Sequence, residues 1–434
     1  MKLWRGKAVF AAELVFIMVV CSITGCVSPF SDKEKGAEPL SISGFAFDTT
    51  YTVTLYQGGS RKLLDHCVSL CTDYEKLLST TRKDSELYQI NKVSREAAES
   101  GEVDGSVSIK ISDQMHDILQ KGLYYCKLSD GNFDISIDPV SSLWDFSSGK
   151  GTVPDAQKIK EALKYVDYHN IRLKKHMLIF QKSGMELDLG GIAKGYIADQ
   201  IREYLTENGV TGAVIDLGGN ILCIGGKNKG DDFRIGIRQP FADREETVAV
   251  VDINGKSVVS SGIYERYIKT DEGAMYHHIL DPKTGYSYDN NLLGVSIISD
   301  RSVDGDGLST TAFTLGLSEG MDLIDSLDDV EAVFITKDEK LHKTLDKCRF
   351  AGADRTAHSQ INLAIGSAGD VCIYLKFLHG YLPEYIGNAL VHADRALHGL
   401  LFVYLYASRD SNIPLPLSKI PLSPPKKCCG LPLN

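Results

Sequence analysis

The chain has 434 residues, 24% of them charged and 43% hydrophobic, and a formal net charge of -10 at pH 7. This length and composition suffice for a well-buried core, and we expect two lobes. Phosphate-binding surfaces need a surplus of Lys and Arg, so the acidic balance argues against a nucleic-acid partner. The ten cysteines show no repeating spacing, which indicates neither a disulfide framework nor a zinc site.

The first residues have the features of an export signal. A basic start with Lys2, Arg5 and Lys7 precedes an apolar stretch over residues 8–20. This stretch is too short to cross a bilayer as a helix, which takes roughly 20 apolar residues. It is followed by Ile23-Thr24-Gly25-Cys26, which resembles a bacterial lipobox. A plain secretory signal with an incidental cysteine and an uncleaved anchor are the alternatives.

We therefore predict a lipoprotein signal peptide over residues 1–25, with Cys26 as the lipidated residue. Two acyl chains on a glycerol would supply the anchoring that a single chain cannot. The largely polar segment 26–43 would serve as a tether. The chain would then be an exported bacterial lipoprotein, held at the periplasmic face of the inner membrane or at an equivalent cell surface.

The first half of the mature chain predicts a mixture of helices and strands. Residues 50–56 alternate apolar and polar side chains, which is typical of a strand. Helices are predicted over residues 62–78 and 112–128. A turn at residues 130–132 and a short strand at 133–137 follow, and then a hairpin over 177–187 with its turn near 182–184.

The second half continues with a helix over residues 192–205, which Asn208-Gly209 ends in the manner of a C-cap. A strand, turn and strand unit is predicted over 212–224. Further strands are predicted at 233–237, 247–253 and 293–298, and a helix that begins near Gly307. Strands and helices do not alternate regularly, so we predict an α+β fold.

A glycine-rich turn from Asp188 to Gly195 is the first group with chemical potential, with the sequence Asp188-Leu189-Gly190-Gly191-Ile192-Ala193-Lys194-Gly195. Its paired glycines let a ligand approach the backbone, and the start of a helix favours anionic oxygens. A lysine in the first helical turn is mildly unfavourable unless a phosphate is there to be neutralised. The alternative is a capped turn with a solvated lysine.

A near repeat follows at Asp216-Leu217-Gly218-Gly219-Asn220, where the pattern favours a plain glycine turn between two strands. Further on, His278 precedes Asp281-Pro282-Lys283-Thr284-Gly285, which is typical of a tight turn. A histidine in this place could act as a general base. Alternatively, the backbone of the turn satisfies its ring.

Asp306 and Thr310 form the last group. They are four residues apart and would share one face of a helix. Together they offer the hard oxygen ligands that Mg²⁺ prefers. Taken alone, an N-cap aspartate and a threonine bonded back to the helix would explain them better.

The order of these motifs resembles the ApbE family of FAD:protein FMN transferases over residues 44–346. The segments that carry the resemblance are Phe47-Asp48-Thr49, Gly131-Asn132-Phe133-Asp134, 188–195, 216–220, Ser261-Gly262-Ile263-Tyr264-Glu265-Arg266-Tyr267, 278–285 and 306–310. The resemblance implies a two-lobed, T-fold-like α+β architecture with FAD in the cleft between the lobes.

The resemblance also implies a role for particular residues. Those that would line the FAD site are Phe47, Asn132, Phe133, Asp134, Asp188 and Lys194. Mg²⁺ would be bound by the backbone oxygen of Gly191 together with Asp306 and Thr310. His278 would deprotonate the acceptor hydroxyl.

The implied reaction moves FMN from FAD to a threonine or serine hydroxyl of an exported acceptor protein, with AMP as the other product. The acceptor pattern of the family is Asp-x-x-(Ser/Thr)-Gly-Ala-(Ser/Thr), on a protein such as a subunit of a redox-driven ion pump. The alternatives are a Mg²⁺-dependent FAD pyrophosphatase that gives FMN and AMP, and a non-catalytic flavin-binding lipoprotein.

The chain departs from the family pattern in several places. Phe47 stands where Met is usual, and Asp145 stands where Gly is usual after Trp144, but neither position belongs to the expected metal site or base. Similarity fades after about residue 346, so residues 347–434 form an extension without an assigned role. An extra helix pair, a poorly ordered appendage and a sequence anomaly are the interpretations open for it.

Overall fold

The computed structural model describes residues 38–344 except 102–104, 147–151, 229 and 244–245, and the backbone of four short strands beyond residue 360. The expected signal peptide, Cys26 and most of the expected tether lie outside the described residues. The chain divides into two compact units, residues 1–355 and 356–434. None of the helices described is both long enough and apolar enough to cross a membrane.

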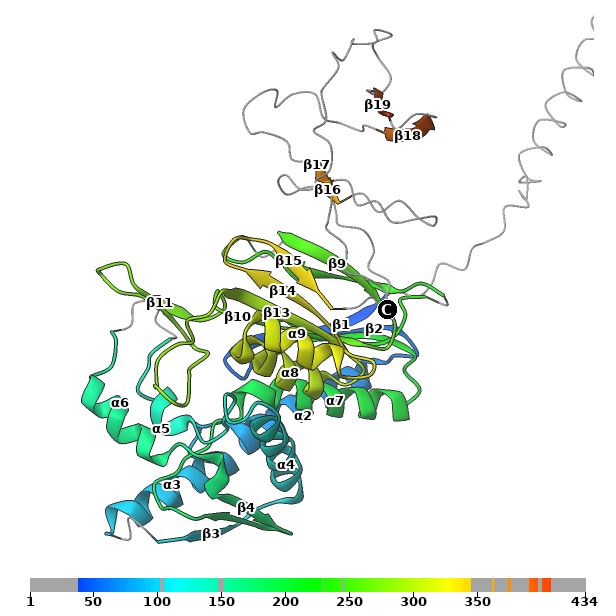
Figure 1. The fold of residues 1–434 in the computed structure, drawn as a ribbon. Coiled ribbons are helices and arrows are strands. Elements are labelled where there is room, and N and C mark those ends of the chain that lie inside the picture. Colours follow the sequence, from blue (N-terminus) through cyan, green and yellow to red (C-terminus); the bar gives the residue numbers. More distant parts are fainter. Residues whose placement is uncertain are drawn as a thin grey trace, which may run out of the picture. The chain divides into compact units, whose positions relative to one another are not determined.

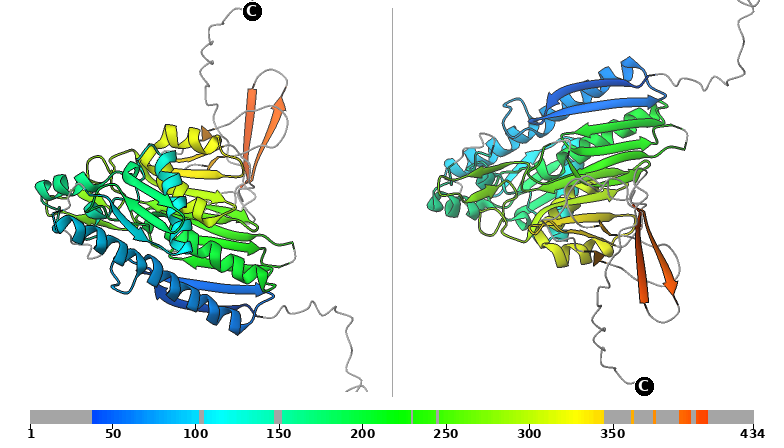
Figure 2. Two further views of the ribbon diagram at one scale, coloured as in Figure 1. Left: turned by 90° about the horizontal axis from the view of Figure 1, so that it is seen from below. Right: turned by 90° about the horizontal axis from the view of Figure 1, so that it is seen from above.

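An antiparallel sheet of eight strands forms the centre of the first unit (Figure 1). Seen from above, its strands lie side by side from blue to yellow (Figure 2). Their order is β1 (Leu40–Ala46), β2 (Thr49–Gln57), β6 (Gly212–Leu217), β7 (Asn220–Gly225), β10 (Ser257–Gly262), β13 (Leu292–Ser299), β14 (Glu331–Thr336) and β15 (Leu341–Lys343). Every neighbouring pair is antiparallel, which confirms the predicted α+β class.

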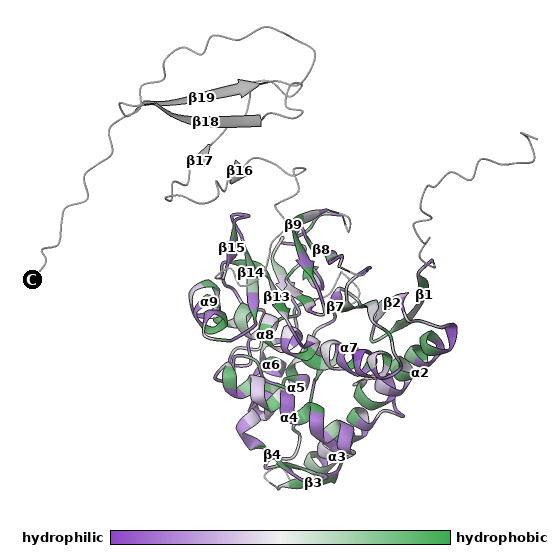
Figure 3. Cartoon of the chain, turned by 90° about the vertical axis from the view of Figure 1, so that its right-hand side faces the viewer, coloured by the Kyte–Doolittle hydropathy of each residue, from purple (hydrophilic) through white to green (hydrophobic). Residues whose placement is uncertain are grey.

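Helices cover one face of this sheet and bury the main core against it. They are α2 (Arg61–Leu78), α7 (Gly190–Glu207), α8 (Ser302–Leu315) and α9 (Leu317–Asp325). Leu64, Ile197 and Ala312 from three of these helices are completely buried, together with Val53 and Ile215 from the sheet. Hydrophilic and hydrophobic residues alternate along α2 in Figure 3, as expected for a helix with one face in the core.

The opposite face of the sheet is covered by a two-stranded ribbon of β8 (Phe233–Arg238) and β9 (Thr247–Ile253). A second hydrophobic cluster joins ribbon and sheet, with Phe233 and Ile253 packed near Val258, Ile298 and Val333. Fully burying one such side chain contributes roughly 1.5–3 kcal/mol. The sheet therefore buries apolar side chains on both faces.

A smaller lobe is inserted between α2 and α7. It contains the sheet β3 (Val107–Lys110), β5 (Met177–Phe180) and β4 (Ile171–Lys174), and the helices α3 (Glu86–Glu99), α4 (Asp113–Leu128), α5 (Asp138–Ser141) and α6 (Ala156–Ala162). Trp144 at its edge donates a hydrogen bond from Nε1 to the Gly285 oxygen, 3.1 Å away. This bond ties the smaller lobe to the turn that follows β11 (Tyr267–Lys269) and β12 (Met275–His277). The expected two-lobed organisation is present.

Three local predictions were wrong. Residues 133–137 form turns with a single bridge from Ile137 to Glu186, not a strand. The hairpin turn lies at Lys175 and joins β4 to β5, not at residues 182–184. The expected second strand of that hairpin, which ends at Leu187, has no partner strand. The Asn91 side chain takes the partner's place: its Oδ1 accepts from the Leu187 amide and its Nδ2 donates to the Leu187 oxygen.

The third error concerns α8, which begins at Ser302 and not near Gly307. Its early turns contain Gly305 and Gly307, which weaken the helical pattern in the sequence. In the structure these glycines allow close packing, since a Cβ at Gly307 would lie 2.3 Å from the Tyr125 ring. Tertiary packing thus overrides the low local propensity.

The second unit is described only as strands. β16 (Ile361–Asn362) pairs with β17 (Tyr374–Leu375), and β18 (Leu390–Ala396) pairs with β19 (Leu400–Tyr406) as an antiparallel hairpin. The apolar run that starts at Leu400 is therefore a strand. These four segments contradict the expectation of an extra helix pair for the part of the extension that they cover.

Candidate functional site

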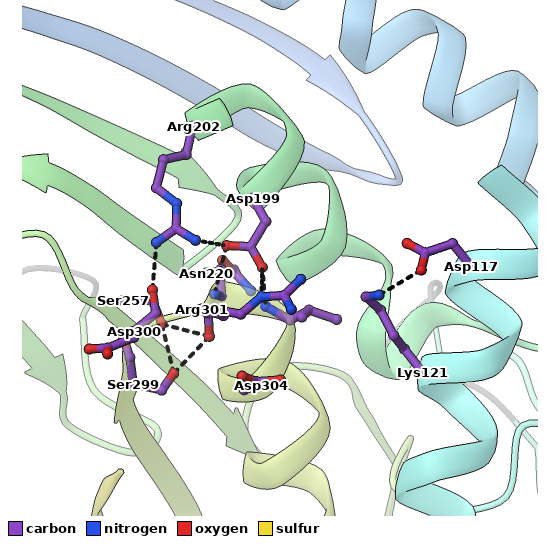
Figure 4. Close-up of polar contacts among 12 residues, drawn as sticks. Asp117, Lys121, Asp199, Arg202, Asn220, Ser257, Ser299, Asp300, Arg301 and Asp304 are labelled. Carbon is purple, nitrogen blue, oxygen red and sulfur yellow. Dashed lines mark hydrogen bonds and ion pairs between the residues drawn. The ribbon is translucent and has the colours of Figure 1, made fainter. Parts of the chain in front are cut away.

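The close contact between helices α7 and α8 positions the residues of the site. A Cβ at Gly195 would lie 2.2 Å from the backbone oxygen of Ser302, so only glycine lets the two helices come this close. One turn further along α7, Asp199 is buried and reaches the first amides of α8 (Figure 4). Its two oxygens accept from the amides of Ser302 and Val303 at 3.0 and 3.1 Å. The aspartate thus caps α8 from a distant part of the sequence.

Two arginines accompany this remote cap. Arg202 lies 3.0 Å and Arg301 lies 3.8 Å from the carboxylate of Asp199 (Figure 4). Burial raises the pKa of Asp199, while the two amides and the two guanidinium groups oppose that rise. The carboxylate is therefore compensated on every side, and α8 is held in a fixed position relative to α7.

Asp199→Ala should destabilise the fold by about 3–5 kcal/mol, because it leaves two buried amides and two arginines without their anion. Thermal denaturation of the full chain measures this as a lower Tm. Asp84→Ala is the matched control, since Asp84 forms a comparable ion pair with Arg82 at 2.8 Å but is exposed. The control should leave Tm almost unchanged. Equal Tm values for both variants would contradict the capping role.

Asp306 is the buried acid of the site, on the α8 face that meets α7. The residue is 4% exposed, and Oδ2 accepts a hydrogen bond of 2.6 Å from the Gly195 amide. The Lys194 ammonium lies 4.0 Å from Oδ1. Burial raises the pKa of Asp306, and Lys194 and the Gly195 amide oppose the rise. The cation and the amide therefore favour the ionised carboxylate.

The bond between Gly195 and Asp306 bears on the predicted metal ligand Gly191. In a regular helix the amide of residue 195 would donate to the oxygen of residue 191. Here this donor is directed to Asp306, at a distance short enough for a strong, charge-assisted bond. The Gly195 amide thus holds the Asp306 carboxylate against the start of α7, the part of the helix that contains the predicted ligand Gly191.

Thr310 lies one turn after Asp306 on the same helix, and its Oγ1 is 3.1 Å from Oγ of Ser261 at the end of β10. Because α8 begins at Ser302, Asp306 is not an N-cap, and that alternative is excluded. In the described part of the chain, no three His, Cys, Asp or Glu side chains come together as metal ligands. A cation here would rely on the Asp306 carboxylate together with hydroxyl and backbone oxygens, and such a donor set fits Mg²⁺.

The predicted segment 131–134 packs against the start of α7. The Phe133 ring is buried and lies so close to Gly191 that a Cβ there would be 2.7 Å from its Cε2. Asn132 accepts from Nζ of Lys283 at 2.9 Å. Asp134 is buried, and its oxygens accept from Ser136 and from the Tyr168 amide. Asp134 therefore shapes the turn, whereas Asn132 connects it to the 281–285 turn.

His278 follows β12 and is open to solvent. Its amide and its Nδ1 both lie within hydrogen-bond distance of the Arg266 oxygen, at 3.1 and 3.2 Å. A carbonyl only accepts, so Nδ1 carries the hydrogen and Nε2 of the neutral ring is a free base. Partial desolvation of the ring by the surrounding protein lowers the pKa of His278, and the positive groups of Arg266 and Lys194 and the neighbouring His277 contribute less. Because the ring still contacts water, the decrease is smaller than for a fully enclosed imidazole.

The neighbouring His277 has a structural environment. It is 4% exposed, and its Nε2 donates to the Tyr288 oxygen at 3.0 Å. Burial lowers its pKa to about 4. The unfolded chain therefore binds a proton at His277 below about pH 6.5 that the folded chain refuses. The contribution of neutral His277 to the free energy of unfolding is therefore fully present above about pH 6.5 and is lost as the pH falls towards 4.

Acidification from pH 7 to pH 5 should cost the wild type about 2 kcal/mol more stability than it costs His277→Gln. Glutamine keeps a donor for the Tyr288 oxygen but does not titrate. Urea denaturation of both proteins at the two pH values measures the difference, and the other titrating groups cancel in the comparison. Parallel losses of stability would contradict the assigned pKa.

Phe47 and Asp188 occupy turn positions at two other edges of the site. Phe47 and Asp48 both have positive φ, 55° and 56°, and form the two-residue turn between β1 and β2. The Phe47 amide donates to Glu75. Asp188 accepts from the Gly190 amide at 2.8 Å and from Ser141 at 3.2 Å, so it caps the start of α7.

Several groups at the site escaped the sequence analysis. Asp199 acts on α8 from about a hundred residues away, and no local pattern marks it. Ser261 lies within a recognised motif, but its contact with Thr310 depends on the pairing of β10 with β13. Asp138 is close to Asp188, and burial together with that negative charge raises its pKa to about 8. Its position in a Pro-containing helix start was the only signal in the sequence.

The geometry defines a class of protein before any comparison is made. A buried carboxylate with an adjacent lysine, helix amides and an accessible neutral imidazole are the groups that phosphoryl transfer requires. The scaffold is an antiparallel α+β fold with an inserted lobe. The class is thus an α+β protein that carries groups suited to phosphoryl transfer.

Comparisons with known proteins agree with this class. The model of the ApbE family matches residues 47–334. FAD:protein FMN transferase of Klebsiella pneumoniae is 36% identical over 281 residues, which cover 64% of this chain and 84% of the relative. FAD:protein FMN transferase of Treponema pallidum is 30% identical, and the alignment covers 78% of this chain and 94% of the relative. This chain belongs to the ApbE family.

A solved structure supports the same conclusion. The apo flavinyl transferase ApbE of Pseudomonas stutzeri is 26% identical, with a TM-score of 0.60, over 71% of this chain and 95% of that chain. The family resemblance, the α+β fold and the assignment as a flavin transferase are thereby confirmed. The individual site residues, the metal and the lipid anchor stay predictions.

Proposed function

We propose that this chain transfers FMN from FAD to a threonine or serine hydroxyl of an exported acceptor protein, with Mg²⁺ as cofactor. The observation that carries the proposal is the grouping around Asp306. Its carboxylate is held between Lys194 and the Gly195 amide, while Thr310 lies one turn along the same helix. Lys194 is also near enough to His278 to lower the pKa of that imidazole.

Each group has a defined task in this reaction. Lys194 and the first amides of α7 would bind the pyrophosphate of FAD. The Gly191 oxygen, Asp306 and Thr310 would hold Mg²⁺, which neutralises charge on the phosphates. Nε2 of His278 accepts the proton of the acceptor hydroxyl. The hydroxyl oxygen bonds to the phosphorus of the FMN half, the pyrophosphate bond breaks, and AMP leaves.

The remaining predicted contacts differ in how directly they reach FAD. Asn132 and Asp188 are partly exposed; Asp188 accepts from the Gly190 amide, and Asn132 accepts from Lys283. Phe47 is half-buried in a strained turn, a feature often found at ligand sites. Phe133 and Asp134 are buried, so we assign them to the walls of the FAD site through Gly191 and Tyr168.

The partner and the location of the chain are part of the proposal. The acceptor would carry the pattern Asp-x-x-(Ser/Thr)-Gly-Ala-(Ser/Thr), as on a subunit of a redox-driven ion pump. Lipidation of Cys26 would anchor the transferase to the membrane in the compartment of its acceptor. The acceptor pattern follows from the family resemblance. The anchor follows from the lipobox-like sequence at Cys26, which lies outside the described residues.

The decisive test incubates the full chain with FAD, Mg²⁺ and a carrier protein that bears the acceptor pattern. Flavin fluorescence that migrates with the carrier on a denaturing gel supports FMN transfer. A carrier with Ala in place of the acceptor threonine should stay unlabelled. Release of FMN and AMP at the same rate without carrier, and no labelled band, would identify a FAD pyrophosphatase with water as nucleophile.

A further inference from the structure

The tight turn over residues 281–285 has no role in the function described so far. Asp281 closes it with its side chain: Oδ1 accepts from the Lys283 amide at 2.8 Å, and Oδ2 accepts from Oγ1 of Thr284 at 3.1 Å. The backbone oxygen of Asp281 also accepts from the Gly285 amide. The backbone of Lys283 is therefore restrained by three bonds around it, while its side chain is exposed.

The same turn packs against the smaller lobe. Gly285 has a positive φ of 77°, and a Cβ there would lie 2.4 Å from Cγ2 of Ile159 in α6. The Gly285 oxygen accepts the bond from Trp144 that ties the smaller lobe to this turn. The turn therefore has a fixed place on the smaller lobe, and the Lys283 side chain extends from a defined point.

Asn132 in the smaller lobe receives two hydrogen bonds from the segment after β12. Nζ of Lys283 donates to its Oδ1, and Oη of Tyr288 donates to its backbone oxygen, both at 2.9 Å. Tyr288 is itself anchored, since its amide donates to the Ile279 oxygen at 3.0 Å. Tyr288 thus restrains the backbone of Asn132, and Lys283 restrains its side-chain amide.

The bond from Lys283 determines which way the Asn132 amide faces. An ammonium group only donates, so it has to meet the oxygen of the amide and not the nitrogen. The Nδ2 atom therefore points away from Lys283. No protein group in the described part of the chain accepts from Nδ2, and Asn132 is partly exposed, so this donor is available to a ligand.

We propose that Lys283 is a positioning residue for Asn132, which fixes the amide so that it offers FAD a hydrogen-bond donor. The role rests on the proposed function, in which Asn132 lines the FAD site. The terminal torsion of a free asparagine is broad, so an unrestrained amide would present its oxygen or its nitrogen and would have to be ordered on binding. With Lys283 in place the donor already faces outward, which strengthens FAD binding without changing the groups that react.

The test is a double-mutant cycle on FAD binding in the absence of an acceptor protein, followed by the change in FAD fluorescence as the full chain is added. Lys283→Met keeps the apolar stem but removes the donor, and Asn132→Ala removes the amide. We expect each single variant to raise the Kd for FAD about 3- to 10-fold. In the Asn132→Ala background, Lys283→Met should change the Kd less than about twofold, because no amide is left to orient.

Two further variants test the lysine itself. Lys283→Arg keeps a cationic donor and should restore most of the affinity that Lys283→Met loses. Lys182→Met is the matched control in the smaller lobe, because Nζ of Lys182 also donates to a neutral oxygen at 2.9 Å, that of Lys164. It should bind FAD as the wild type does. In steady-state transfer, Lys283→Met should raise the KM for FAD and leave kcat within about twofold.

The outcomes separate this role from the proposed function. Equal effects of Lys283→Met in the wild-type and Asn132→Ala backgrounds overturn the positioning role, and so does an unchanged Kd in folded Lys283→Met. A wild-type chain that binds no FAD contradicts both the role and the proposed function. A coupled cycle in a chain that labels no acceptor upholds the role of Lys283 and contradicts only the proposed transfer.

Discussion

Asp306→Ala should reduce FMN transfer about 10³-fold or more at any Mg²⁺ concentration. The substitution removes the only carboxylate in the proposed metal site and leaves Lys194 and the Gly195 amide without their anion. Metal and electrostatic stabilisation is the main contribution that a protein makes to phosphoryl transfer, and losing one such group typically costs 10²–10³-fold in rate. The initial rate of fluorescent labelling of the acceptor measures the loss.

The comparison needs a variant that separates chemistry from folding. Asp306→Asn retains the shape and an acceptor for the Gly195 amide, so it should fold well while transfer stays low. Thr311→Val is the matched control on the same helix, because Thr311 is completely buried and its hydroxyl has no partner in the described structure. It should leave both Tm and transfer almost unchanged. Unchanged transfer by either Asp306 variant would refute the metal assignment.

The parts of the fold that the sequence predicted depend on local signals. The helix that starts after the glycine pair ends at Asn208-Gly209, and Gly209 has the positive φ of 82° that a C-cap requires. The tight turn before Gly285 is closed by the bond from the Gly285 amide to the Asp281 oxygen, at 2.7 Å. In both cases neighbouring residues determine the conformation, so the chain itself contains the information.

The parts that the sequence did not reveal depend on side chains that replace secondary structure at long range. Asn91 satisfies the backbone of Leu187, 96 residues away, and thereby gives this residue the hydrogen bonds that a partner strand would have supplied. Asp199 caps α8 across 103 residues. No periodicity marks such residues, because their bonds join segments that are distant in the sequence and exist only in the folded chain.

In the candidate site, too, some features follow from the local sequence and others depend on distant residues. The grouping of Asp306 and Thr310 follows from their spacing on one helix, and the structure has both on the face of α8 that meets its neighbours. The choice between a metal site and an N-cap could not be made from spacing, because it depends on where α8 begins. The start at Ser302 decides it, and that start is determined by Asp199 and not by the residues around Asp306.

His278→Ala should lower FMN transfer by about 10²–10⁴-fold and leave FAD binding unchanged within a factor of about two. The imidazole contributes a base and not a structural contact, since its ring is open to solvent and bonds only to the Arg266 oxygen among the described residues. Labelling rates and the quenching of FAD fluorescence measure the two effects separately. Lost FAD affinity with an unchanged rate at saturating FAD would instead make His278 a substrate contact.

The pH profile provides the sharper half of this test. A base works only in its neutral form, and the pKa of His278 is lowered, so transfer by the wild type should remain nearly constant from pH 8 down to pH 7 and decline only below about pH 6.5. In His278→Ala this acidic decline should disappear from the residual rate. His169→Ala is the matched control, because His169 is 68% exposed at the surface, and it should retain the wild-type profile. An acidic decline that persists in His278→Ala would assign the titrating base to another group.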